Sequence, residues 1–199
     1  MPKLILRSVC LFAAAVLGGF SVSAQDRPVV AAPSYEATLF VLVGSDDSSQ
    51  RGDLPRSLDT VSKQIRDSFS FRNYRLMNTY YGRLADSGSL DYKSVSSLKT
   101  STELDSPTFL DWQLAKFQAN AAGSNVLNVE LFRFGARVPV HISNPGRPEA
   151  SIPVTNYESV GLTLNKLSLK PNSPTLIGTI SLPRTTGTIF LVMTISPVS

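Results

Sequence analysis

The sequence predicts an α+β protein in which one amphipathic helix packs on a bulged, mainly antiparallel β-sheet or an open β-sandwich. One segment repeats its apolar residues with the 3.6-residue period of a helix, and from residue 108 onward apolar and polar residues alternate with the period of two that strands require. Three of these alternating segments change phase, as β-bulges do. With 42% apolar residues, 199 residues suffice for one such domain.

The first 24 residues have the three parts of a secretory signal peptide. Lys3 and Arg7 form a basic start, residues 9–17 are apolar, and residues 22–24 (Val-Ser-Ala) resemble a cleavage site. The apolar run is too short to span a bilayer, and no later run is long enough. We therefore expect a bacterial protein that is exported to the periplasm or the medium, with no transmembrane segment after residues 1–24 are removed.

Cleavage would also remove the only cysteine, Cys10, together with two of the basic residues behind the formal net charge of +4. The remaining chain then has no thiol for a disulfide, a nucleophile or a metal site. Its small net charge does not favour nucleic acid as a partner. We expect residues 25–34 to be a flexible leader into a single α+β domain over residues 35–199.

Residues 35–84 are predicted to form a strand-helix-strand unit. Residues 35–43 are apolar on both faces, as in a central strand, and a polar loop follows. The helix after it has one apolar stripe, made of Leu54, Leu58, Val61, Ile65 and Phe69. Pro55 suits the first helical turn, Asp53 is the expected N-cap, and residues 74–84 return as a second strand.

The portion over residues 108–199 is predicted to be rich in β-strands. Its phase changes fall after Leu114, after Leu131, and between Leu164 and Leu167. Each of these strands is therefore expected to contain a bulge. Pro139 cannot donate a hydrogen bond to a neighbouring strand, so we expect the half-strand over residues 133–142 to lie at a sheet edge or a bend.

The candidate partner-binding residues are arginines, one tyrosine and the single histidine. They are Arg72, Tyr74 and Arg75 on the second strand, and Arg133, Arg137 and His141 on the half-strand that contains Pro139. The last three are spaced so that they project to one face and offer a partner a positive stripe. The alternative is that the arginines only keep a sheet edge soluble, that the tyrosine completes the core, and that the histidine is an exposed strand residue.

No catalytic, cofactor or metal site is predicted, and we expect a protein that is not an enzyme. His141 is the only histidine, whereas zinc sites without cysteine usually take two or three, and a catalytic triad needs a histidine with partners. Asp46, Asp47 and Asp53 share one loop and could offer oxygens to calcium. Their spacing does not fit an EF-hand, so a solvated loop is favoured.

The opening at Leu54 and Pro55, the helix to Phe69 and the strand at residues 71–76 (Phe-Arg-Asn-Tyr-Arg-Leu) resemble exported bacterial proteins of uncharacterised function. The strand-helix-strand unit over residues 35–84 is also similar to the periplasmic N-domains of secretins, the ring-forming outer-membrane channels. This resemblance implies assembly with protein partners in the cell envelope. It assigns no functional residue.

The sequence therefore leads to two expected functions. The first is a non-catalytic exported envelope module that acts in protein–protein binding or assembly. The alternative is a secreted β-sandwich protein that binds a carbohydrate or a lipid. An open strand edge would favour the first function, whereas exposed aromatic residues lining a groove would favour the second.

The mature protein is expected to begin at Gln25, because the small residue Ala24 ends the predicted cleavage site. Intact-mass analysis of protein purified from the periplasm or the medium checks this expectation. A mass that still includes residues 1–24 would contradict it.

Overall fold

Two four-stranded antiparallel sheets pack face to face in the computed structural model, which describes residues 33–46, 52–96, 107–119, 125–142, 154–182 and 187–198. All of these residues fall within the compact unit Ala32–Ser199. The signal peptide predicted over residues 1–24 and most of the predicted leader lie outside the described residues. The predicted combination of antiparallel sheets with one helix in a sandwich is confirmed.

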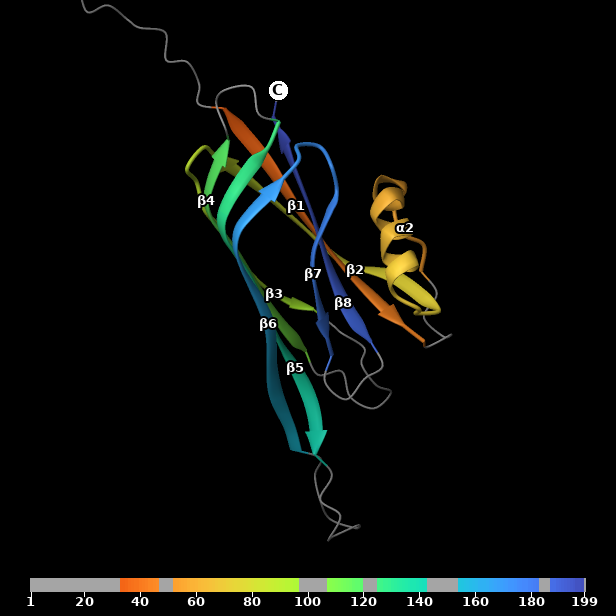
Figure 1. The fold of residues 1–199 in the computed structure, drawn as a ribbon. Helices are drawn as coiled ribbons and strands as arrows, with labels where there is room; N and C mark the ends of the chain where they lie inside the picture. The colour runs from red at the N-terminus through yellow and green to blue at the C-terminus, as the bar shows by residue number, and fades with distance from the viewer. Residues whose placement is uncertain are drawn as a thin grey trace, which may run out of the picture. The chain divides into compact units, whose positions relative to one another are not determined.

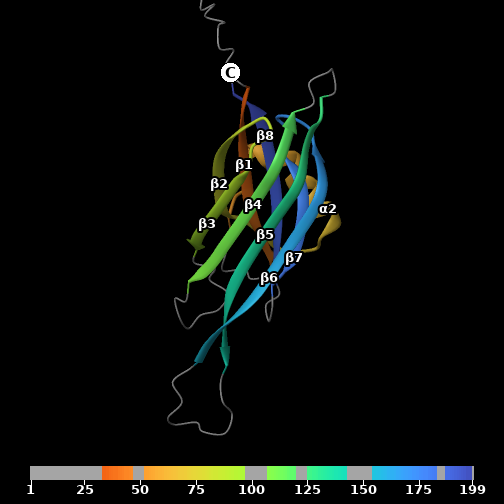
Figure 2. The same cartoon turned by 90° about the vertical axis from the view of Figure 1, so that its left-hand side faces the viewer.

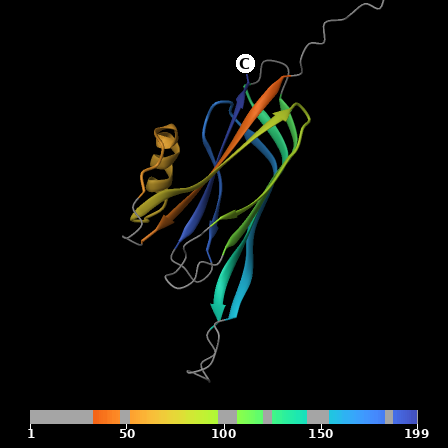
Figure 3. The same cartoon turned by 180° about the vertical axis from the view of Figure 1, so that it is seen from behind.

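The strand order is β2-β1-β8-β7 in sheet A and β3-β4-β5-β6 in sheet B. Figure 1 shows sheet B, sheet A and the helix α2 as three successive layers, and Figure 3 shows the same layers from behind. The strands are β1 (Ser34–Ser45), β2 (Asn73–Ala85), β3 (Leu90–Ser96), β4 (Thr108–Ala119), β5 (Leu127–Ile142), β6 (Val154–Leu169), β7 (Thr175–Ser181) and β8 (Thr188–Pro197).

The described strands follow one another around the sandwich in sequence order. The chain passes from sheet A to sheet B between β2 and β3, runs through β4, β5 and β6 as neighbours, and returns to sheet A with β7. β8 then pairs with β1 from Tyr35↔Pro197 to Gly44↔Thr188. The first and last strands therefore lie side by side at the centre of sheet A.

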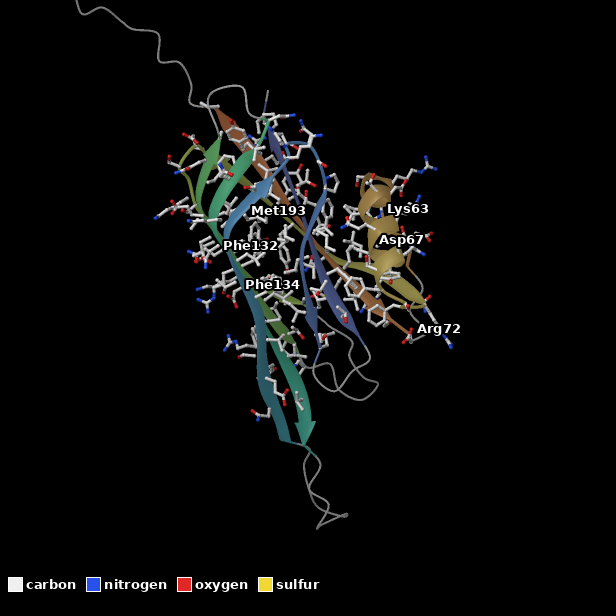
Figure 4. All side chains as sticks on the ribbon, in the orientation of Figure 1. Lys63, Asp67, Arg72, Phe132, Phe134 and Met193 are labelled. Atoms are coloured by element: carbon white, nitrogen blue, oxygen red, sulfur yellow. The ribbon has the colours of Figure 1, made fainter. Side chains whose placement is uncertain are left out.

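The main core lies between the two sheets. Sheet B contributes the fully buried side chains of Trp112, Phe132 and Phe134, and sheet A contributes those of Leu39 and Met193. Figure 4 shows Phe132 and Phe134 directed toward Met193 across the interface between the sheets. At about 25 cal/mol per Å² of apolar surface removed from water, these large side chains supply much of the stability of a domain without disulfides.

The helix is confirmed, and it covers part of the outer face of sheet A. A 3-10 turn (η1, Arg56–Leu58) leads into α2 (Asp59–Ser68), and Leu58, Val61 and Ile65 of the predicted stripe are buried. Leu54 and Phe69, the two ends of the predicted stripe, lie just outside the helical segments and are partly buried. This stripe packs against a second apolar cluster on sheet A that includes Leu42, Tyr74, Phe190 and Val192. In the part of the chain that the structure describes, no helix is both long and apolar enough to cross a membrane.

The predicted N-cap at Asp53 is wrong. Pro55 is the N-cap residue of the 3-10 turn and Leu58 is that of the α-helix, and neither side chain makes a capping hydrogen bond. The N–H of Leu58 instead donates to the carbonyl oxygen of Pro55 at 2.9 Å. Backbone thus satisfies one free donor of the turn, and Asp53, which is exposed, lies two residues ahead of the cap position.

The three predicted phase changes are present in β4, β5 and β6 of sheet B, and they occur at paired positions on these neighbouring strands. Lys116 on β4 and Lys166 on β6 have left-handed backbones with φ of 53° and 58°. Both lie at the level of Glu130 on β5, and Lys116 Nζ lies 2.7 Å from Glu130 Oε2. The register of β5 with β4 and β6 is unchanged across this level. The bulges predicted here are therefore wrong, because the backbone turns without an inserted residue.

Register shifts occur in sheet A instead, where the pairing of β1 with β2 shifts between Val41 and Leu42, and that of β7 with β8 between Leu176 and Gly178.

The half-strand over residues 133–142 is an edge only in part. β5 is an interior strand of sheet B and pairs with both β4 and β6 as far as Arg137. Beyond Arg137 it pairs with β6 alone, through Pro139↔Tyr157 to Ile142↔Val154. The expectation of an edge from residue 133 is thus wrong, whereas Pro139 does lie past the last residue paired with β4, where its missing N–H costs no bond on that side.

Ile65→Ala is expected to lower the free energy of unfolding by about 2–5 kcal/mol, because Ile65 lies on the buried face of α2 and is fully buried. Lys63→Ala, on the exposed face of the same helix, should change it by no more than about 0.5 kcal/mol. Chemical denaturation of both variants measures the two values, and the reverse ranking would contradict the observed packing of α2.

Lys166→Gly is expected to raise the free energy of unfolding by about 0.5–1 kcal/mol, because glycine removes a left-handed penalty of about 1–2 kcal/mol that its extra freedom in the unfolded chain only partly offsets. The neighbouring exposed residue Asn165 is not left-handed, so Asn165→Gly should lower stability by about 0.5–1 kcal/mol. Denaturant melts of both variants test the opposite signs. Equal effects would show that the backbone at Lys166 carries no penalty.

Candidate functional site

A groove with a volume of about 870 Å³ crosses the outer face of sheet B, the face turned away from sheet A. Figure 2 views this side of the molecule, with β3, β4, β5 and β6 in front. The floor of the groove is formed by Gly135 on β5 and Gly161 on β6, which are cross-strand partners. Arg133 and Thr163 rise on one side of this floor, and Arg137 and Ser159 rise on the other.

The hollow exists because two glycines occupy outward positions on neighbouring strands. At Gly161 a Cβ atom would lie 2.7 Å from the carbonyl oxygen of Phe134, a contact with backbone that cannot move aside easily. At Gly135 a Cβ atom would lie 2.8 Å from Oδ1 of Asp111. Glycine is therefore required for packing at Gly161, and at Gly135 it makes room for a carboxylate.

Asp111 brings the only carboxylate among the groove-lining residues of the described chain. It pairs across the sheet with Gly135 on one side and with Lys93 of β3 on the other. The closeness of its oxygens to Gly135 shows that the carboxylate leans over the glycine floor. It therefore lies at the level between Arg133 and Arg137 on the adjacent strand.

The charged groups of the groove do not neutralise one another. Among the described residues the one ion pair within 4 Å joins Lys116 and Glu130, outside the groove. Arg133, Arg137 and Asp111 are thus available to a ligand, and Lys93 adds a third cation to the lining. Together these side chains give the groove an excess of positive charge, which favours an anionic ligand.

An apolar stripe borders the groove on the side of Arg137. The guanidinium carbon of Arg137 lies 5.1 Å from the ring centre of Phe109, and Phe109 lies 5.6 Å from Tyr157 between ring centres. Val95, which pairs with Phe109, is 62% exposed, and Tyr157 is 37% exposed. The ring of Phe109 fixes the direction of Arg137, so that less side-chain entropy is lost when Arg137 binds a ligand.

The six predicted site residues divide between the two sheets. Arg133 and Arg137 project to one face as predicted, and both line the groove. His141 belongs to β5, but its side chain lies outside the described part of the structure. Arg72, Tyr74 and Arg75 lie in or next to β2 of sheet A, so they share no surface with the groove.

The second group of predicted residues has local structural contacts. Tyr74 is buried beside α2, its hydroxyl donates to the carbonyl oxygen of Phe69 at 2.6 Å, and burial raises the pKa of its phenol. The backbone N–H of Arg72 donates to Oδ1 of Asp46 at 3.1 Å. Arg75 is half-buried, and burial lowers the pKa of its guanidinium. Tyr74 thus completes the core, as the alternative interpretation expected.

Sequence reasoning did not identify Phe109, Asp111, Gly135 or Gly161 as site residues. A signal was present, since each glycine occupies a polar-face position in an alternating strand. The pattern could not show that the two glycines are cross-strand partners or that Asp111 lies beside them. That information depends on the strand order and the register.

The described residues hold no group of three or more His, Cys, Asp or Glu side chains that could bind a metal ion. Of the acidic loop considered for calcium, Asp46 accepts the N–H of Arg72, Asp53 is exposed, and Asp47 lies outside the described residues. No protein-family model matches the amino-acid sequence, and no curated protein matches it significantly. The inference about function therefore depends on the groove itself.

Proposed function

We propose that the protein is a non-catalytic binding module of the bacterial cell envelope that binds a protein partner on the outer face of sheet B. The observation that supports this most directly is the position of two unpaired arginines, Arg133 and Arg137, on either side of a glycine floor. Arginine and aromatic residues are enriched at protein interfaces, and here an exposed apolar stripe lies next to the arginines. The predicted signal peptide supports the location in the envelope.

The mode of binding differs from the strand addition that an open edge at residues 133–142 would have allowed. From Arg133 to Arg137 the backbone of β5 already pairs with β4 and β6, so it has no free row of donors and acceptors. A partner must therefore contact side chains on the face of the sheet. The groove supplies one carboxylate, three cations and three hydroxyl groups, all of which are polar groups that a protein partner can contact.

A carbohydrate ligand is the second candidate. Phe109 lines the groove and Tyr157 lies beside it, while Ser159 and Thr163 offer hydroxyl groups on the opposite strand. Sugar rings commonly stack on aromatic faces while their hydroxyl groups form hydrogen bonds. Loss of binding to cell-wall glycan fragments in the Tyr157→Ala variant, with protein capture unchanged, would favour this candidate.

Arg133→Glu combined with Arg137→Glu is expected to reduce partner capture at least tenfold, because two attractive contacts become repulsive. Purified protein is immobilised, exposed to envelope extract, and the captured proteins are quantified by mass spectrometry. The melting temperature should stay within about 3 °C of the wild-type value, since both side chains are exposed and neither forms an ion pair with another described residue.

The matched control is Arg56→Glu combined with Lys63→Glu, which reverses the same number of charges at exposed positions of the helical segments. This variant should capture the partner as well as the wild type does. Unchanged capture by the folded groove variant would overturn the proposed function, and equal losses in both variants would show that only net charge matters.

A further inference from the structure

We infer that the partner segment is an extended chain with an acidic, a basic and an acidic residue at alternate positions, lying along β5 over the glycine floor. This inference rests on the proposed function, and it narrows the partner to a protein segment with one charge order. The observations that carry it are the order of charges along β5, their spacing, and the space above Gly135 and Gly161.

The charges along β5 alternate in sign. Arg133 contributes a positive charge, the carboxylate of Asp111 leans over Gly135, and Arg137 contributes a second positive charge. The three groups therefore present the order positive, negative, positive to a ligand that runs parallel to β5. A segment with the order negative, positive, negative places an opposite charge at each position, which gives both attraction and register.

The spacing favours an extended ligand. Residues two apart on a strand are separated by about 6.7 Å, and the alternate side chains of an extended ligand repeat at the same distance. In an α-helix, residues four apart rise by about 6 Å, but each such step also rotates by about 40° around the helix axis. Over the three charges a helix would therefore spread its side chains over about 80°, whereas a strand keeps alternate side chains in one row above β5.

The floor explains why the central residue of the ligand is basic. Gly135 and Gly161 bring no side chains to the middle of the groove, so a long basic side chain of the ligand has room there to reach the carboxylate of Asp111. Lys93 lies on the far side of Asp111 but forms no ion pair with it in the described structure. Asp111 thus keeps its charge available to a cation that arrives over the glycines.

Binding of synthetic peptides to the wild-type protein tests the charge order directly. The matched peptide contains Glu-Thr-Lys-Thr-Glu, the inverted peptide contains Lys-Thr-Glu-Thr-Lys, and a composition control contains Lys-Thr-Glu-Thr-Glu. Fluorescence anisotropy at low salt should show the matched peptide binding at least tenfold more tightly than either of the others. The difference should shrink at about 0.5 M salt, because these contacts are solvent-accessible.

A charge-swapped protein provides the reciprocal test. Arg133→Glu, Asp111→Lys and Arg137→Glu together should reverse the preference, so that the inverted peptide binds better than the matched one. Gly135→Ala should weaken the matched peptide several-fold in the otherwise unchanged protein, because the added Cβ atom takes the place of the Asp111 carboxylate. Thermal melts establish that both variants are folded, and the peptide ranking on the wild type does not depend on them.

Equal binding of the three peptides, or no binding of any, would overturn the inference. Preferential binding of oligogalacturonate would also overturn it and would identify an acidic glycan as the ligand. If the peptides fail while Arg133→Glu with Arg137→Glu still abolishes partner capture, the proposed function stands with a partner of different chemistry. If that groove variant leaves capture unchanged, the proposed function itself fails.

Discussion

The pairing of β1 with β8 is the constraint on which the sandwich depends. These two strands come from opposite ends of the described chain and form the centre of sheet A. Both are buried on two faces, since residues such as Leu39 and Met193 contact sheet B while Leu42 and Phe190 contact the helix side. Without this pairing, sheet A would separate into two unconnected pairs of strands, and α2 would lose the apolar surface on which it packs.

The groove depends on a second constraint, the phase change at the level of Glu130. Before Glu130 in the sequence, the odd-numbered residues Leu127 and Val129 of β5 face the core. After Glu130, the even-numbered residues Phe132 and Phe134 are buried, and the odd-numbered positions face outward. If β5 kept a single phase, Arg133, Gly135 and Arg137 would point into the core instead of lining the groove.

The same change in β6 turns Gly161 outward, with Lys166 in the left-handed conformation at that level. A left-handed lysine costs of the order of 1 kcal/mol. Lys116 and Lys166 each carry this conformational free-energy cost, on the two strands that flank β5 at Glu130. Local strain is thus linked to the placement of the candidate binding face, because all three strands must change phase together for sheet B to keep one buried side.

The amino-acid sequence by itself determined the features that depend on local periodicity. The helical stripe with Val61 and Ile65, the three phase changes, and the shared face of Arg133 and Arg137 were all predictable, because the direction of a side chain follows from its position in a helix or strand. Only the tertiary structure decided that β5 is interior, that Tyr74 belongs to the core, and that Asp111 meets Gly135 and Gly161. Strand order and register join residues that are far apart in the chain, and no local pattern encodes which strand becomes the neighbour of another.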